Sequence, residues 1–133
     1  MSAYAADGNF EFAIRAMESA GDSLLMTAFG ELEVVHALEL RAFRKEMNRE
    51  QVDLCVDNFG RDVKAGVFDL LAVPELAFRR AREVSRKTTA QFGTRTSDLL
   101  HVACALELGA IGFDSFDKQQ RRLAKSMNLT LND

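Results

Sequence analysis

The sequence is poor in cysteine, proline and long hydrophobic runs. The shortage of cysteine and of hydrophobic runs argues against a disulfide-bonded protein and against a membrane-spanning protein. Its 133 residues include two cysteines and one proline. No apolar run approaches the ~20 residues that a membrane-spanning helix needs, so we expect no membrane partner. No secretory leader pattern is recognisable, and Cys55 and Cys104 both lie inside helical apolar patterns. We therefore expect two reduced, buried thiols in a cytoplasmic protein, rather than a disulfide or a metal site.

What the sequence does contain is the composition of an ordinary globular protein. It is 47% hydrophobic and 28% charged, with a net charge of −3. A chain of this length is most simply one domain, here residues 1–133, with a core large enough to be stable without cross-links. The basic residues gather in three segments, 41–45, 79–87 and 121–125. We interpret them as solvated helix faces that permit a nucleic-acid partner without requiring one.

Helical and strand-like patterns alternate along the chain. Apolar residues at helical spacing predict helices over residues 9–20, 29–47, 49–64, 74–92, 98–108 and 118–127. Short apolar runs predict strands over residues 24–27, 67–73, 111–113 and 129–131. The expected helix caps are Asn48 and either Thr96 or Ser97, with Pro74 as a first helical residue and Gly109 as a left-handed terminator. This alternation predicts an α/β fold with a parallel sheet that helices cover on both faces.

Acidic residues stand where such a fold binds its ligands. Asp114 and Asp117 follow the strand predicted at 111–113, and Asp98 lies in the first turn of the helix before it. Ligands of open α/β sheets bind outside the carboxyl ends of the strands. Glu33, in the helix predicted over 29–47, would join this group if its side chain points to the same edge. Asp98 and Glu33 also have a purely structural interpretation. An acid in the position of Asp98 stabilises the start of a helix, and Glu33 can be an exposed acid on a helix surface.

A cluster of carboxylates is costly unless a cation occupies it, because the negative charges repel each other. Oxygen ligands alone suit Mg²⁺ or Mn²⁺, which bind through a few carboxylates and keep sites for a phosphate substrate. One or two such ions can activate water and stabilise the leaving oxygen of a phosphodiester. If the acids do converge, they would therefore suit a divalent metal ion, and such an ion is able to act on a phosphodiester.

Two segments carry a resemblance to a known family. Residues 95–124, RTSDLLHVACALELGAIGFDSFDKQQRRLA, resemble the carboxyl half of a PIN domain, and residues 27–38, TAFGELEVVHAL, resemble the helix around the family's second acid. The likeness is to the ribonuclease toxins of bacterial toxin–antitoxin pairs that are called virulence-associated protein C (VapC). Within it, Glu33, Asp98 and Asp117 match the second, third and fourth acidic positions. Ser115 matches a hydroxyl residue that helps to order the site, and Arg95 matches the Arg that precedes the third acid.

The resemblance implies a three-layer α/β/α sandwich and a Mg²⁺- or Mn²⁺-dependent endoribonuclease. It implies Glu33, Asp98 and Asp117 as catalytic metal ligands, with Ser115 and Arg95 in support. Asp114 stands where the family usually has an apolar residue, and its position after the strand makes it a candidate for a further carboxylate at the site. The implied partners are RNA, a cognate antitoxin protein and a second copy of the chain.

The first residues depart from the family pattern, which begins with a strand that ends in an Asp and a short helix. The segment MSAYAADGNF resembles the loop that follows that helix. We therefore expect the central strand of the sheet and the first acid to be missing, as if the start codon lay further upstream. Asp7 does not replace that acid, because no apolar strand precedes it. On this expectation the chain has little ribonuclease activity.

Two other functions use the same residues. A catalytically impaired PIN-like protein would still bind an antitoxin but would not cut RNA. Alternatively, Glu33-x-x-His36 and Asp98-x-x-His101 each put a carboxylate and an imidazole one helical turn apart, as in di-metal helical bundles. That bundle needs an all-helical chain. For the all-oxygen nuclease site, replacing His101 should leave metal affinity nearly unchanged, whereas in the bundle it should abolish tight iron binding.

Overall fold

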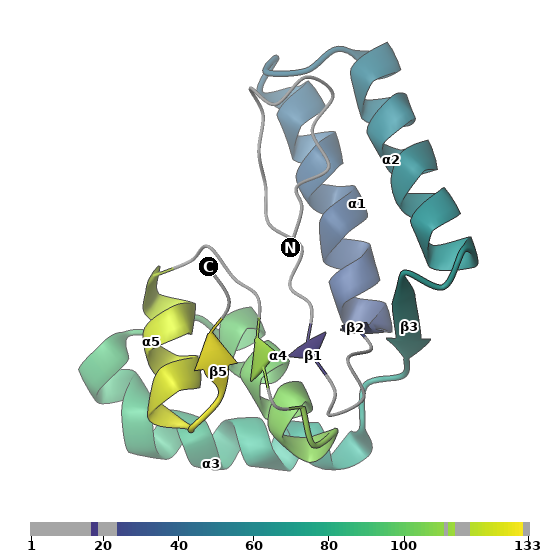
Figure 1. Cartoon of the computed structure of the whole chain (residues 1–133). Helices are drawn as coiled ribbons and strands as arrows, with labels where there is room; N and C mark the ends of the chain where they lie inside the picture. Colours follow the sequence, from purple (N-terminus) through teal and green to yellow (C-terminus); the bar gives the residue numbers. More distant parts are fainter. Residues whose placement is uncertain (1–16, 19–23, 111, 114–117, 132–133) are drawn as a thin grey trace.

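The computed structural model describes residues 17–18, 24–110, 112–113 and 118–131 (Figure 1). Within these ranges the helices are α1 (Ala28–Phe43), α2 (Arg49–Lys64), α3 (Glu75–Phe92), α4 (Thr96–Glu107) and α5 (Lys118–Ser126). The strands are β1 (Met17–Glu18), β2 (Leu24–Thr27), β3 (Phe68–Leu71), β4 (Gly112–Phe113) and β5 (Thr130–Leu131). The fold is α/β in character and mostly helical.

The strands form one mixed sheet in the order β3-β2-β1-β4-β5. The pairs β2–β3 and β4–β5 are parallel, as the alternation of strands and helices predicts. The central strand β1 runs antiparallel to both of its neighbours, β2 and β4. Since β1 opposes both neighbours, β2, β3, β4 and β5 all run in the same direction. Their carboxyl ends therefore meet at one edge of the sheet.

The centre of the sheet differs from the sequence prediction in two ways. Met17 and Glu18 form a strand, so the helix predicted over 9–20 is wrong at these two positions, while its other residues lie outside the described ranges. The position between β2 and β4 is also occupied, although we expected the central strand to be missing. Backbone pairing with two neighbouring strands satisfies the amides of Met17 and Glu18 and overrides the helical spacing of the local side chains.

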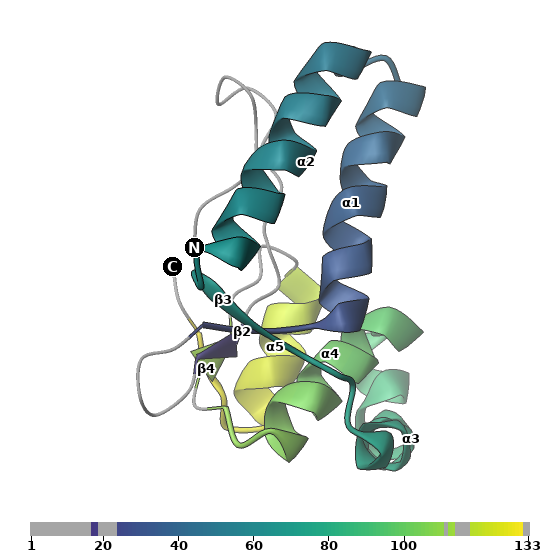
Figure 2. The same cartoon turned by 90° about the vertical axis from the view of Figure 1, so that its right-hand side faces the viewer.

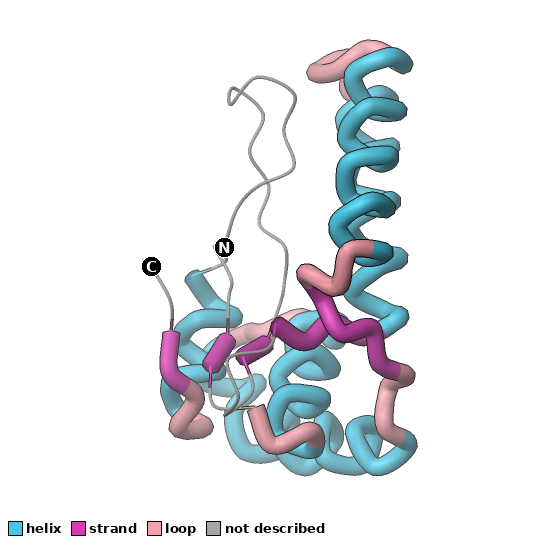
Figure 3. The backbone as a smooth tube through the Cα atoms, turned by 45° about the vertical axis from the view of Figure 1, so that its right-hand side comes forward, coloured by secondary structure: helices cyan, strands magenta, loops and turns pink. Residues whose placement is uncertain are grey.

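The helices pack into two separate hydrophobic cores, one on each face of β2. Leu25 joins a core built from α3, α4, α5 and the segment around β5. Met26, the next residue, joins a core built from α1, α2 and β3. Consecutive strand residues point to opposite faces, so β2 contributes to both cores. Figure 2 shows α1 and α2 above β2 and β3, with α3 and α4 below, and Figure 3 shows the longer strands at the junction of the two helix groups.

Most element boundaries agree with the sequence prediction. The strand at Leu24–Thr27 and the helix at Arg49–Lys64 have the predicted bounds. Asn48 caps α2 through a reciprocal pair of hydrogen bonds with Gln51. Gly93 and Gly109 end α3 and α4 with φ of 64° and 69°, which is the left-handed region that glycine tolerates.

Several boundaries differ from the prediction by one or two residues, and three predictions about helix ends were wrong. The first long helix ends at Phe43 rather than residue 47, because the chain turns at Lys45, whose φ is 60°. The helix α4 begins at Thr96, with Arg95 as its N-cap and no side-chain cap, although Thr96 or Ser97 was the expected cap. Pro74 is the N-cap of α3 rather than its first helical residue. None of the helices described is long and apolar enough to cross a membrane.

The packing of the α1–α2 core predicts how two leucine substitutions in α1 change the stability of the protein. Leu38 of α1 has an exposed fraction of 0%, and Leu32 on the same helix has 62%. Leu38→Ala should lower the free energy of unfolding by about 2–5 kcal/mol, because the truncation leaves a cavity in the α1–α2 core. Leu32→Ala makes the same chemical change in water and should cost no more than ~0.5 kcal/mol. Urea denaturation of the two variants measures the difference, and equal losses would contradict the packing described here.

Candidate functional site

The first turns of three helices meet at the carboxyl edge of the sheet. α1 starts directly after β2, where the Thr27 hydroxyl accepts a hydrogen bond from the Gly30 amide at 3.1 Å. α5 follows β4 in the chain, and its residue Gln120 contacts Asp98 in the first turn of α4. The second turns of α1 and α4 are also joined, by Glu33 and His101. This edge is where ligands of parallel sheets bind.

Asp98 is a buried carboxylate held by two donors. Its exposed fraction is 1%. Gln120 Nε2 donates to Asp98 Oδ1 at 3.3 Å, and Arg95 Nε donates to Asp98 Oδ2 at 3.4 Å. The two donors come from different elements, since Gln120 is in α5 and Arg95 is the N-cap of α4. The free N–H groups of the first turn of α4 add a favourable field for the negative charge. The orientation of both carboxylate oxygens is therefore constrained.

Glu33 reaches across from α1 to α4. His101 Nε2 donates a hydrogen bond to Glu33 Oε1, and the His101 ring lies 5.2 Å, centroid to centroid, from the ring of Phe29. His101 is buried and lies one helical turn after Asp98. The acid from α1 is thus held beside the helix that carries Asp98. His101 is a core histidine as its position in an apolar helix indicates, but its partner is a carboxylate rather than the backbone.

This contact changes one expectation from the sequence. An all-oxygen site predicts that His101 has no influence on metal affinity. Because His101 contacts the Glu33 carboxylate directly, its removal would take away one of the contacts that orient that carboxylate. The imidazole acts on the site through Glu33 and need not touch a metal.

The predicted site residues are placed as follows. Glu33 and Asp98 lie on facing helices, and Arg95 lies beside Asp98. Asp114, Ser115 and Asp117 lie outside the described residues, so their part in the site stays a prediction. Within the described ranges, no group of three or more His, Cys, Asp and Glu side chains could hold a metal. The two carboxylates that are described supply the oxygen donors that suit Mg²⁺ or Mn²⁺.

Gln120 is the residue that sequence reasoning missed. It lies on the same face of α5 as Leu123 and Ala124, at positions i, i+3 and i+4, and all three have an exposed fraction of 0%. A polar side chain on an otherwise apolar helix face is a signal, because a buried amide needs hydrogen-bond partners. Its partner lies 22 residues earlier in the chain, however, and the sequence alone does not supply that pairing.

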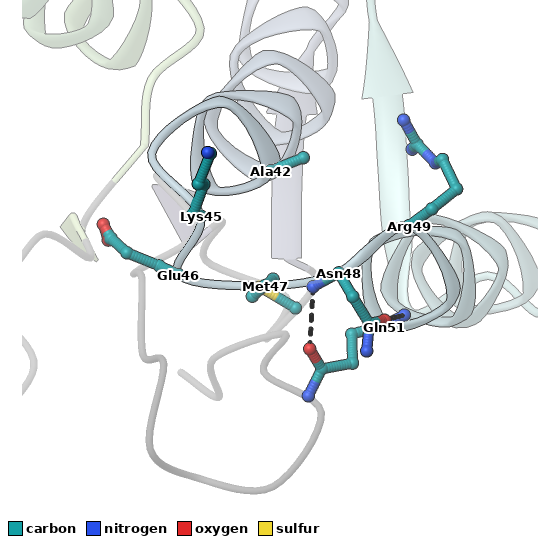
Figure 4. A pocket seen from close by; sticks show the side chains of 7 residues that line it. All are labelled: Ala42, Lys45, Glu46, Met47, Asn48, Arg49 and Gln51. Carbon is teal, nitrogen blue, oxygen red and sulfur yellow. Dashed lines mark hydrogen bonds between the residues drawn. The ribbon is translucent and has the colours of Figure 1, made fainter.

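Two other groups of residues do not belong to this site. A pocket of about 570 Å³ opens at the turn between α1 and α2, beside Lys45, Met47 and Asn48 (Figure 4). Its nearest α1 residue, Ala42, is nine residues after Glu33, or ~14 Å along the helix.

His36 is exposed on α1, and the described residues include a five-stranded sheet. The di-metal bundle requires an all-helical chain, so the fold removes its basis.

Some residues of the basic segments make contacts between helices. The Arg122 guanidinium lies 5.0 Å from the centre of the Phe92 ring, which joins α5 to α3. Arg80 Nη1 is 3.5 Å from Glu107 Oε1, which joins α3 to α4. These side chains hold the α3–α4–α5 group together.

The model of the PIN domain family matches residues 1–126. The chain belongs to the PIN domain family. Members of this family are generally nucleases that use divalent metal ions. Comparison with individual curated proteins gave no match.

The Glu33–His101 contact leads to a prediction about metal affinity. His101→Ala should weaken Mn²⁺ binding by roughly 10- to 100-fold, because the loss of an orienting partner usually costs that much. His36→Ala, an exposed imidazole on the helix that carries Glu33, is the matched control and should leave binding unchanged. Titration with Mn²⁺, followed by electron paramagnetic resonance, measures both. Equal affinities in the wild type and His101→Ala would show that His101 does not position Glu33.

The buried thiols predict a pH dependence of stability. Burial raises the pKa of the Cys104 thiol from its usual 9.0 to about 11. The unfolded chain therefore loses this proton at lower pH than the folded chain does. The contribution of the neutral thiol to folding is complete below pH 9.0 and falls as the pH rises to about 11, by roughly 2–3 kcal/mol in all. Cys104→Ala should lack this fall.

Urea denaturation of the wild type and Cys104→Ala at pH 8 and pH 10.5 tests this. The difference in unfolding free energy between the two proteins should shrink at the higher pH, since only the wild type carries the titrating thiol. A difference that stays the same at both pH values would contradict the prediction.

Proposed function

We propose that this chain is a divalent-metal-dependent endoribonuclease of the VapC-like toxin type, with Glu33, Asp98 and Asp117 as metal ligands. Asp114 adds a further carboxylate, and Ser115 and Arg95 support the site. Membership of the PIN domain family supports nuclease activity in general. The substrate, the toxin role and the ligand set are our proposal.

One observation carries the proposal. A carboxylate of α1 and a buried carboxylate of α4 are held at the carboxyl edge of one sheet by polar contacts that link α1, α4 and α5. Burying Asp98 at an exposed fraction of 1% is costly unless the charge is used or fully paired. The proposed metal-binding atoms are all carboxylate oxygens, which are the ligands that Mg²⁺ and Mn²⁺ prefer.

The residues have separate roles in this mechanism. A bound divalent ion would supply positive charge for the phosphate and for the oxygen that leaves. Asp98 fixes the position of that charge, because both of its oxygens have hydrogen-bond donors. Glu33 contributes from the facing helix, where His101 holds its orientation. Arg95, whose side chain is largely exposed, stands where it can contact the RNA backbone.

We also propose a compartment and binding partners for the protein. As a VapC-like toxin it would act on RNA in the cytoplasm as a single domain, pair with a cognate antitoxin protein and associate with a second copy of itself. The two helix groups on either face of β2 support a small three-layer arrangement of the sheet and its helices.

Replacing single carboxylates tests the function. The sequence leads us to expect slow cleavage by the wild type. Glu33→Gln and Asp98→Asn should each lower this Mn²⁺-dependent RNA cleavage further, by roughly 100-fold or more, because removing a ligand costs at least as much as removing its orienting partner. Glu31→Gln, two residues from Glu33 in the same helix, is the matched control and should cleave like the wild type. The measurement is cleavage of a labelled RNA with and without Mn²⁺, with circular dichroism to confirm folding.

Each possible outcome of this assay has a meaning. Full cleavage by folded Asp98→Asn would remove Asp98 from the site and contradict the proposal. A folded wild-type protein that binds Mn²⁺ but cuts no RNA would favour the catalytically impaired interaction protein. For the toxin role, expression of the wild type should arrest growth, and expression of Asp98→Asn should not.

A further inference from the structure

Gln120 is placed to control the geometry of the Asp98 carboxylate. It lies in the first turn of α5 and has an exposed fraction of 0%. Its Nε2 atom donates to Asp98 Oδ1 at 3.3 Å and lies 3.4 Å from the backbone oxygen of the same residue. One amide group therefore contacts both the side chain and the main chain of Asp98. It joins the start of α5 to the start of α4.

The chemistry of this donor distinguishes it from Arg95. A hydrogen bond from a neutral amide orients a carboxylate without cancelling its charge, so the carboxylate keeps its attraction for a cation. Arg95 donates to the other oxygen, but its side chain has an exposed fraction of 71% and its charge competes with a cation. The buried donor is the one whose position the packing around it fixes, since Leu123 and Ala124 of the same helix are fully buried in the α3–α4–α5 core.

We propose that Gln120 is a positioning residue that holds the Asp98 carboxylate in its metal-binding orientation. This inference rests on the proposed function, because it needs Asp98 to be a metal ligand. Gln120 acts through Asp98 and does not itself bind the ion. Outer partners that orient a ligating carboxylate commonly contribute 10- to 100-fold to metal affinity, and we expect an effect of about this size.

The test replaces the amide without emptying the space that it fills. Gln120→Met has a similar length and no donor, and it should raise the half-saturating Mn²⁺ concentration by roughly 10- to 100-fold. Gln120→Asn keeps the amide but shortens its reach by one methylene, and it should show the same kind of loss. Mn²⁺ binding is measured by electron paramagnetic resonance, and the Mn²⁺ dependence of RNA cleavage is measured beside it.

Two controls separate positioning from general packing. Leu123→Ala opens a cavity in the same helix and should lower the thermal midpoint, but it should leave Mn²⁺ affinity unchanged wherever the protein is folded. Gln91→Met makes the same chemical change at an exposed position of α3 and should change neither quantity. In the Gln120 variants, saturating Mn²⁺ should restore most of the cleavage rate, because the chemistry of the remaining ligands is intact.

The outcomes distinguish this inference from the function on which it rests. Gln120→Met and Gln120→Asn with wild-type Mn²⁺ affinity would overturn the positioning role and leave the nuclease proposal standing. An equal loss of affinity in Leu123→Ala would also overturn it, because packing alone would then explain the effect. A folded wild type without Mn²⁺ binding would overturn both.

Discussion

The alternation of side chains along β2 sets the arrangement of everything packed around it. Leu25 lies in the core of α3, α4 and α5, and Met26 lies in the core of α1 and α2. The four-residue strand β2 thus lies between two cores that have no buried hydrophobic residue in common among those described. The contact between Glu33 and His101 is a polar link across this division, at the edge where β2 gives way to α1. Packing brings the two groups together, and this link joins the second turns of α1 and α4.

The site edge combines features that packing alone would not favour. A carboxylate as buried as Asp98 has lost most of its hydration, and its contacts include hydrogen bonds from Gln120 and Arg95. Apolar residues of similar volume would fill the same space at lower cost. Local departures of this kind are expected where function constrains the sequence, and they coincide here with the positions that the PIN resemblance marks.

The parts of the fold that were predictable carry strong local signals. α2 has a capping box at Asn48 and a regular apolar face, and β2 is a short apolar run that ends at a helix cap. β1 was missed because two residues are too few to show a strand period, and their conformation depends on β2 and β4. The start of α4 was missed because Arg95 caps it without a side-chain hydrogen bond, which leaves no cap residue to recognise.

The residues of the candidate site also differ in how far the sequence predicts their positions and contacts. The place of Asp98 in the first turn of a helix was predictable from the local sequence, and its part in a metal site stays a prediction. The partner of Glu33 was not predictable, because His101 lies 68 residues further along the chain. The role of Gln120 depends on how α5 packs against α4, and a single amide in a helical pattern does not reveal its partner. Sequence patterns identify which residues are chemically suited to a site, while the contacts between distant residues decide how each one is held.

The division between the two cores has a consequence for how the chain folds. The α1–α2 core draws its residues from 24–68, and the other core draws its residues from 71–131 together with Leu25. Each core is therefore assembled almost entirely from one continuous stretch, and its helices can associate by closing short loops. Among the described residues, the two stretches meet in the sheet, at Leu25 in the second core and in the Glu33–His101 contact. We expect two early-forming halves whose joining along β2, β1 and β4 is the slow step, with the polar contacts at the site edge completed last.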